Sequence, residues 1–182
     1  MIADKWRYLI DELRYLAENA SDVGVYLAVE NHFNTMAVSA ADTARLVKEV
    51  DHPHVGILYD QANLVFTHNE PTEEALALQR GLVVYVHVKD LVFINRDIPF
   101  RAIAVAKVDS SERAVRSRVV GQGEIDWFSI LRGLKEQGYD GWLSLEYERR
   151  WHPQDLPPAE IGMRESARYV RDLLAKLEGD SQ

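Results

Sequence analysis

The sequence contains no cysteine among its 182 residues. Disulfide bonds, zinc sites built on thiolates and cysteine nucleophiles are therefore excluded for this chain. The lack of cysteine also fits a reducing compartment, so we predict a cytoplasmic protein. No apolar run approaches the ~18 residues of a membrane-spanning helix. The N-terminal segment MIADKWRYLIDELRYLAENA carries charges every few positions, unlike a signal peptide, and we expect no membrane partner.

The chain has fewer basic than acidic residues, with 21 Lys and Arg, 29 Asp and Glu, and a formal net charge of −8. An acidic chain argues against general affinity for nucleic acid, so we expect no nucleic-acid partner. The hydrophobic share of 47% and the charged share of 27% are typical of globular proteins. Because no linker rich in proline, glycine or serine divides the chain, we predict a single α/β domain over residues 1–182.

Helical and strand patterns alternate along most of the chain. Apolar residues at helical spacing predict a helix over residues 5–19. Capping residues and helical patterns predict further helices over residues 39–50, 71–79, 126–137 and 160–177. Continuous β-prone runs, typical of strands covered on both faces, occupy residues 23–29, 55–59, 82–88 and 142–147. This alternation predicts parallel βα repeats.

Residues 91–123 interrupt the alternation and are too many for an ordinary βα loop. Two runs containing apolar residues, 101–108 and 113–120, flank Asp109-Ser110-Ser111, which is compatible with a hairpin. Gly121-Gln122-Gly123 looks like a phosphate loop but lacks the rest of that motif. We interpret these glycines as a turn that precedes the helix starting at Asp126.

Each predicted strand ends in a side chain that can bind a metal: Glu30, Asp60, His87 and Glu146. In parallel α/β folds the carboxyl ends of the strands meet at one edge, where binding sites form. One such acid could merely cap a helix or pair with a lysine, but four successive strand ends favour a shared site. Three carboxylates and one imidazole suit a divalent cation, Mn²⁺ first, with Mg²⁺, Co²⁺ or Zn²⁺ as alternatives.

Five motifs carry a resemblance to a known family. They are VYLAVENH at 25–32, VGILYDQAN at 55–63, VHVKD at 86–90, GQGEIDW at 121–127 and YDGWLSLEYE at 139–148. In this order they resemble the xylose-isomerase-like TIM-barrel superfamily, and within it the sugar phosphate isomerase/epimerase group. That group also includes ketose 3-epimerases, inosose dehydratases and AP-endonuclease relatives. The resemblance implies a mononuclear metal site with Glu30, Asp60, His87 and Glu146 as ligands.

The resemblance also implies an activity. Glu30 and Glu146 would face opposite sides of a bound sugar carbon, and the ion would acidify the C–H next to a carbonyl. One glutamate would remove the proton and the other return it, giving an isomerase or epimerase of a sugar or sugar-like polyol through an enediolate. A dehydratase on the same scaffold is an alternative. Asn63 stands where the endonucleases have histidine, which argues against nuclease activity.

Three neighbouring residues are candidate substrate contacts. His32 could bond a substrate hydroxyl, or it could be a loop histidine with a structural partner. Asn63 could orient a ligand or contact substrate, or make loop hydrogen bonds only. Lys89 could stabilise a developing oxyanion, or be an ordinary exposed lysine.

Only four strands are recognisable, whereas a complete TIM barrel has eight. By the resemblance, the motifs present are those of the C-terminal half of the barrel. The chain could therefore be a fragment, a truncated gene product, or a half-barrel that associates with itself. A non-catalytic, metal-binding half-barrel that self-associates is the second alternative function. Uncovered strand edges and apolar side chains lead us to expect a homo-oligomer.

Overall fold

A parallel sheet of four strands forms the centre of the molecule. The computed structural model describes residues 2–33, 35–98, 113–150 and 152–179. The strands follow the order β1 (Leu27–Glu30), β2 (Val55–Tyr59), β3 (Val83–Val88) and β6 (Leu143–Leu145). Every neighbouring pair in this sheet is parallel. The predicted α/β fold with parallel βα repeats is therefore confirmed.

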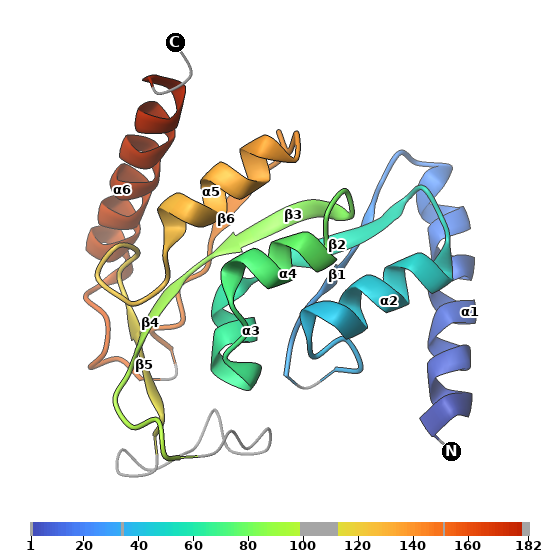
Figure 1. Ribbon diagram of the computed structural model, residues 1–182, viewed down its shortest axis with the longest axis horizontal. Helices are drawn as coiled ribbons and strands as arrows, with labels where there is room; N and C mark the ends of the chain where they lie inside the picture. The colour runs from blue at the N-terminus through green and yellow to red at the C-terminus, as the bar shows by residue number, and fades with distance from the viewer. Residues whose placement is uncertain (1, 34, 99–112, 151, 180–182) are drawn as a thin grey trace.

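Helices link and cover the strands of this sheet. They are α1 (Ile2–Ser21), α2 (Ala40–Val50), α3 (Gln61–His68), α4 (Thr72–Leu78), α5 (Trp127–Glu136) and α6 (Ala159–Gly179). Figure 1 shows α1 and α6 at opposite ends of the molecule, with α2 and α4 lying across the sheet between them. The predicted caps are confirmed, because Ser39 accepts from the backbone N–H of Asp42, and Asp126 accepts from that of Ser129.

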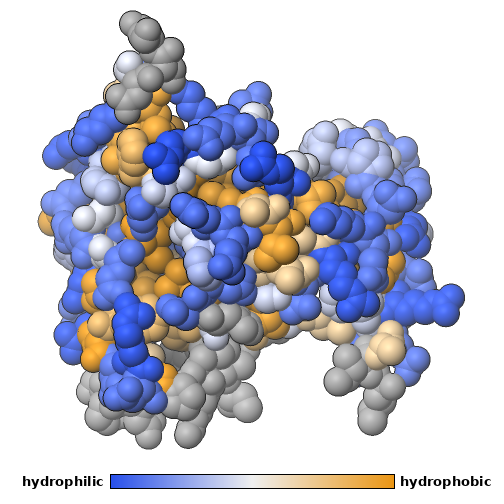
Figure 2. Space-filling model, in the orientation of Figure 1, coloured by the Kyte–Doolittle hydropathy of each residue, from blue (hydrophilic) through white to orange (hydrophobic). Residues whose placement is uncertain are grey.

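Two apolar clusters hold the helices against the sheet. The larger one joins β2 and β3 to α5 and α6 through buried Tyr59, Val86, Trp127 and Leu173. The smaller one joins α1 and α2 to β1 and β2 and includes fully buried Ile57. In the view of Figure 2, hydrophilic side chains cover the outer helical surfaces, and hydrophobic side chains appear in the bands between them.

Two local predictions need correction. The strand predicted from residue 23 begins only at Leu27, because Gly24, with a φ of +70°, lies in a turn after α1. Val23, Val25 and Tyr26 are exposed rather than covered on both faces. Helix α3, which begins immediately after Asp60, has no counterpart among the predicted helices.

The long interruption carries its own small sheet. Strand β4 (Asp90–Phe93) pairs antiparallel with β5 (Val115–Arg118). The second predicted hairpin strand therefore exists and pairs with residues 90–93. The first predicted hairpin strand, residues 101–108, and the turn Asp109-Ser110-Ser111 lie outside the described residues. Figure 1 shows β4 and β5 projecting beyond the end of β3.

The outer strands of the main sheet each have one strand neighbour among the described residues. A cavity of about 590 Å³ runs along β1 and is lined mainly by apolar side chains, including Leu9 and Leu13 of α1. A smaller cavity of about 230 Å³ lies where Leu143 of β6 meets α5 and α6. Within the described residues, each edge of the sheet therefore lies beside a largely apolar cavity. Within the described part of the chain, none of the helices is long and apolar enough to cross a membrane.

Candidate metal centre

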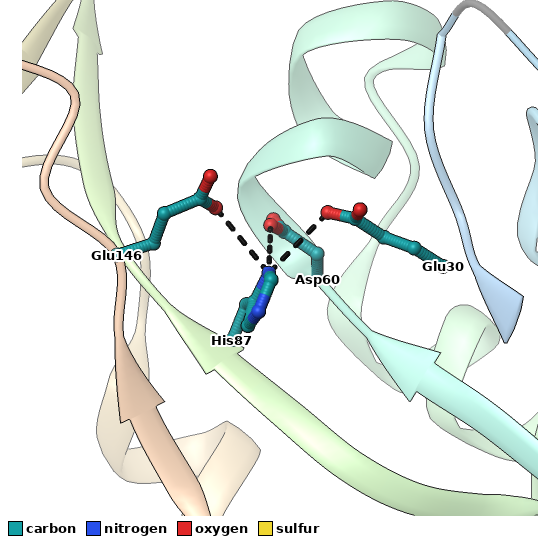
Figure 3. A group of neighbouring side chains, drawn as sticks. All are labelled: Glu30, Asp60, His87 and Glu146. Carbon is teal, nitrogen blue, oxygen red and sulfur yellow. Dashed lines mark ion pairs between the residues drawn. The ribbon is translucent and has the colours of Figure 1, made fainter. Parts of the chain in front are cut away.

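The carboxyl edge of the parallel sheet brings together the four side chains singled out from the sequence. Glu30 ends β1, Asp60 follows β2, His87 is the penultimate residue of β3, and Glu146 follows β6. One candidate ligand atom from each lies within 4.8 Å of the others. In Figure 3, Glu30 and Glu146 reach the group from opposite sides, with Asp60 and His87 between them. We call these four residues the quartet.

His87 lies at the centre of the quartet. Its Nδ1 atom is 3.3 Å from Glu30 Oε1, 3.4 Å from Glu146 Oε2 and 3.8 Å from Asp60 Oδ2. The Asp60 side chain is fully buried, whereas those of Glu30 and Glu146 are 29% and 33% exposed. The quartet therefore has a buried floor and is open to solvent beside the two glutamates.

The packed charges shift the pKa values of the quartet. Close contact with the carboxylates of Glu146 and Glu30 raises the pKa of His87 to about 10. The same contact with His87 lowers the pKa of Glu146 to about 2, against the opposing effect of burial. Burial raises the pKa of Glu30, but His87, Lys89 and His32 together outweigh burial and lower it. Burial raises the pKa of Asp60 to about 6 despite nearby Lys89.

Two quartet atoms lack a hydrogen-bond partner although they are buried. These atoms are Asp60 Oδ2 and His87 Nδ1. Buried polar atoms normally have hydrogen-bond partners, so an exception points to a bound ligand or a functional role. The two atoms lie 3.8 Å apart, and carboxylate oxygens with an imidazole form a suitable donor set for Mn²⁺ or Mg²⁺. The residues present therefore fit a divalent cation.

Two asparagines hold the floor of the quartet. The buried side chain of Asn31 donates to the Asp60 carbonyl at 2.7 Å and accepts from the Asp60 N–H at 3.1 Å. Asn63 donates to Glu30 Oε1 at 3.2 Å, and its backbone N–H donates to Asp60 Oδ1 at 2.9 Å. Asn63 thus orients two quartet carboxylates, as metal sites often require. Sequence reasoning misses Asn31, whose only signal is its place directly after Glu30.

Lys89 also lies inside the site. Its Nζ atom is 2.9 Å from Glu146 Oε2, 3.0 Å from Asp60 Oδ2 and 3.8 Å from Glu148 Oε1. Burial lowers the pKa of the Lys89 ammonium, but the surrounding carboxylates outweigh burial and raise it. The Lys89 side chain is only 11% exposed, so the alternative of an ordinary exposed lysine is excluded.

His32 lies at the border of the site. Its ring stacks on that of Phe33 with 4.0 Å between ring centroids. The positive field of His32 makes a minor contribution to lowering the pKa of Glu30. Both alternatives for this residue, a substrate contact and a structural loop histidine, stay predictions.

The glycine-rich turn at residues 121–123 has a structural role. Asp90 accepts backbone hydrogen bonds from four residues of the chain: Leu91, Gly121, Gly123 and Ile125. A Cβ at Gly123 would overlap the Asp90 carboxylate, and Gly121 has a φ of +90°. The predicted turn is therefore confirmed, and its N–H groups bind an internal carboxylate where a phosphate loop would bind a phosphate.

Comparison with known proteins assigns the chain to a family. The model of the family described as xylose isomerase-like TIM barrel matches residues 2–173. The chain belongs to this family. Family members with a complete barrel have eight parallel strands and form their sites at the carboxyl ends of those strands. The quartet occupies the same end of the four strands of the main sheet.

Individual relatives match about half of their own length. Inosose dehydratase of Geobacillus thermodenitrificans is 28% identical over 169 residues, covering 93% of this chain and 55% of that protein. The rhizopine catabolism protein MocC of Rhizobium meliloti is 30% identical over 173 residues, covering 92% of this chain and 50% of that protein. The chain thus spans about half the length of the curated relatives it matches.

A solved structure from the xylose isomerase-like TIM barrel family shows the same fold. It is a protein from Mycobacterium smegmatis in complex with magnesium, similar with a TM-score of 0.71 and 21% identity. The match covers 92% of this chain and 50% of that one. The four-stranded sheet therefore corresponds to part of a larger barrel architecture.

Proposed function

We propose that the protein binds a divalent cation at the quartet and takes part in proton transfer next to a carbonyl of a sugar or sugar-like polyol. The observation that carries this proposal is the convergence of four candidate ligand atoms within 4.8 Å of one another, of which His87 Nδ1 is buried without a hydrogen-bond partner. The donor set favours Mn²⁺, with Mg²⁺, Co²⁺ or Zn²⁺ as alternatives. The magnesium complex of a structural neighbour agrees with a hard divalent ion.

Glu30 and Glu146 are the proposed acid and base. They approach the quartet from opposite sides and are its most exposed carboxylates. When bound, the cation would polarise a substrate carbonyl and acidify the neighbouring C–H. One glutamate would then accept the proton on its carboxylate while the other delivers a proton to the opposite face. This exchange inverts or isomerises the carbon, as in a sugar isomerase or epimerase.

A dehydratase is the second candidate, and the curated relatives favour it. The Geobacillus relative is an inosose dehydratase. Dehydration begins with the same removal of a proton beside a carbonyl. The second glutamate would then protonate a departing β-hydroxyl, which leaves as water, instead of returning a proton to carbon. The two reactions thus use the same residues and differ in the final proton acceptor.

The neighbouring side chains have separate proposed roles. His32, at the open side, would bond a substrate hydroxyl. Lys89, 2.9 Å from Glu146, would stabilise negative charge that develops on a substrate oxygen. Asn63 already donates to Glu30 and to the Asn31 carbonyl, so orienting Glu30 is its main proposed contribution.

We also propose that the described fold is one domain that associates with a second copy of itself. Each outer strand of the main sheet has one strand neighbour among the described residues, and apolar cavities flank both edges. A second copy would cover these edges, and two-fold symmetry is the commonest arrangement for homo-oligomers. Light scattering coupled to size exclusion should give a mass above the 20.8 kDa of one chain. A well-folded monomer that binds no apolar dye would contradict the proposal.

The activity proposal is tested by hydrogen exchange in deuterated water. The protein is incubated with Mn²⁺ and either a ketose or an inosose, and NMR follows loss of the substrate C–H signal. We expect Glu30→Gln and Glu146→Gln to slow exchange by at least ~10²-fold, because each removes a proton carrier. Glu136→Gln, on the exposed surface of α5, is the matched control. Mass analysis for loss of water separates a dehydratase from an epimerase.

Absence of any exchange in the parent protein, with Mn²⁺ still bound, would favour a non-catalytic metal-binding half-barrel. Full exchange in both glutamine variants would exclude the proposed acid and base.

A further inference from the structure

Lys89 occupies an unusual place for a cation, because it lies beside the atoms that face the proposed metal. Asp60 Oδ2 lies 3.0 Å from Lys89 Nζ and 3.8 Å from His87 Nδ1. Glu146 Oε2 lies 2.9 Å from Lys89 Nζ and 3.4 Å from His87 Nδ1. The lysine therefore shares two of the three carboxylates of the quartet with the proposed ion.

The position of Lys89 is fixed by its surroundings. Its backbone carbonyl accepts a hydrogen bond from the indole Nε1–H of buried Trp127 at 3.2 Å. The next residue, Asp90, is held by the four N–H groups of the β4 and glycine-turn backbone. The ammonium is thus presented to the carboxylates from a rigid strand end rather than from a free loop.

The positive charge of Lys89 acts on the carboxylates of the quartet and on any ion that they bind. Without an ion, the three quartet carboxylates repel one another, and Asp60 is fully buried. A positive charge at about 3 Å from two of them reduces that repulsion. Once a divalent cation binds, the same ammonium repels it and draws on the same oxygens. One residue therefore has opposite effects on the empty and the loaded site.

We propose that Lys89 is a built-in counter-cation, which holds Asp60 and Glu146 in place before an ion binds and competes with the ion for their charge. The competition half of this inference rests on the proposed metal function, whereas the stabilising half does not. Lys89 then sets how tightly the site holds its ion, in addition to any contact with substrate.

The first experiment measures Mn²⁺ binding by titration calorimetry on Lys89→Met, Lys89→Arg and the parent protein. We expect Lys89→Met to tighten Mn²⁺ binding by at least about tenfold, because a nearby positive charge is removed. Lys89→Arg, which keeps the charge, should stay close to the parent. Lys48→Met removes the same charge from the exposed surface of α2 and should leave binding unchanged. Unchanged or weaker binding in Lys89→Met would overturn the competition.

The second experiment measures melting temperatures with all divalent metal removed by a chelator. We expect Lys89→Met to melt several degrees lower than the parent and Lys48→Met to melt like it. Adding Glu146→Gln to Lys89→Met should raise the melting temperature again, because it removes one of the repelling charges. If Lys89→Met alone does not fold, recovery of folding in the double variant would likewise support the stabilising role of Lys89.

The two experiments separate the proposals. A double variant that melts no higher than Lys89→Met would overturn the counter-cation role, because a lysine needed only for packing gains nothing from Glu146→Gln. Absence of Mn²⁺ binding in every variant would overturn the proposed metal function and the competition. The metal-free melting series would then decide the stabilising role by itself.

Discussion

Asp60, directly after β2, and Asp90, the first residue of β4, are both buried aspartates, yet their surroundings differ. Asp90 receives four backbone N–H hydrogen bonds on its two carboxylate oxygens. Asp60 accepts one backbone hydrogen bond, on Oδ1 from the N–H of Asn63, while Oδ2 has no hydrogen-bond partner and forms an ion pair with Lys89 Nζ at 3.0 Å. Burial raises the pKa of both groups, and the backbone donors around Asp90 partly offset that rise.

These two surroundings distinguish a structural carboxylate from one available for a ligand. Both carboxylate oxygens of Asp90 accept hydrogen bonds from the backbone, and these bonds connect β4 to the glycine turn. The two carboxylate oxygens of Asp60 have different neighbours. Oδ1 caps helix α3, and Oδ2 lies near His87 Nδ1 and Lys89 Nζ. Both parts of the sequence alternative, an acid that caps a helix or pairs with a lysine, therefore hold for Asp60, which in addition lies in the quartet. Substitutions at both aspartates and around the quartet test this division of roles.

Replacing Asp90 should cause the greatest loss of stability among these substitutions. Asp90→Ala leaves four backbone N–H groups without their acceptor, and each unsatisfied buried donor costs about 1–3 kcal/mol. We expect a loss of at least ~3 kcal/mol in the free energy of unfolding, measured by urea denaturation. Asp60→Asn should destabilise less while abolishing the Mn²⁺-induced rise in melting temperature. The reverse pattern would show that the roles are exchanged.

Removing the imidazole should abolish the response to metal. An ion at ~100 times its dissociation constant stabilises the folded state by about 2.7 kcal/mol. We expect His87→Ala to lose this stabilisation, seen as a melting temperature that no longer rises with Mn²⁺. His54→Ala is the matched control, since His54 lies at the opposite end of the sheet, just before β2. A full shift in His87→Ala would place the ion elsewhere.

The metal-free protein should lose stability as the pH rises above neutrality. The pKa of His87 is raised from 6.5 to about 10 in the folded protein. Its contribution is therefore complete below pH 6.5 and is lost as the pH rises towards about 10. Denaturation with a chelator present should show a decline of up to about 1 kcal/mol per pH unit in this window. His87→Gln should flatten it, and an equal slope in both proteins would exclude His87 as the source.

The mildest change is expected from loss of the support beneath the quartet. Asn63→Ala removes the side-chain hydrogen bonds to Glu30 and to the Asn31 carbonyl, each worth about 1 kcal/mol in stability. It should weaken Mn²⁺ binding about tenfold, because residues that orient metal ligands typically contribute 10–100-fold in affinity. Calorimetric titration checks this value, with Asn95→Ala in the segment after β4 as the control. Unchanged affinity would show that Glu30 needs no such support.

Much of the fold follows from local patterns in the sequence. Helix α1 has apolar residues at helical spacing, and Ser39 and Asp126 cap their helices as predicted. Four β-prone runs form one parallel sheet, and the acids and histidine at their ends come together. These features are readable because hydrogen bonding and periodicity act over a few residues, and because parallel strands bring their carboxyl ends to one edge.

The tertiary structure alone decided what depends on residues far apart in the chain. Nothing local to Lys89 shows that it meets Asp60 and Glu146, and nothing local to Asn31 shows that it binds the Asp60 backbone. The pairing of β4 with β5 is also set at a distance, since the glycine turn closes on Asp90. Sequence determined which side chains stand at the strand ends. Only packing across the sheet decided which atoms of these side chains have a hydrogen-bond partner within the chain and which have none.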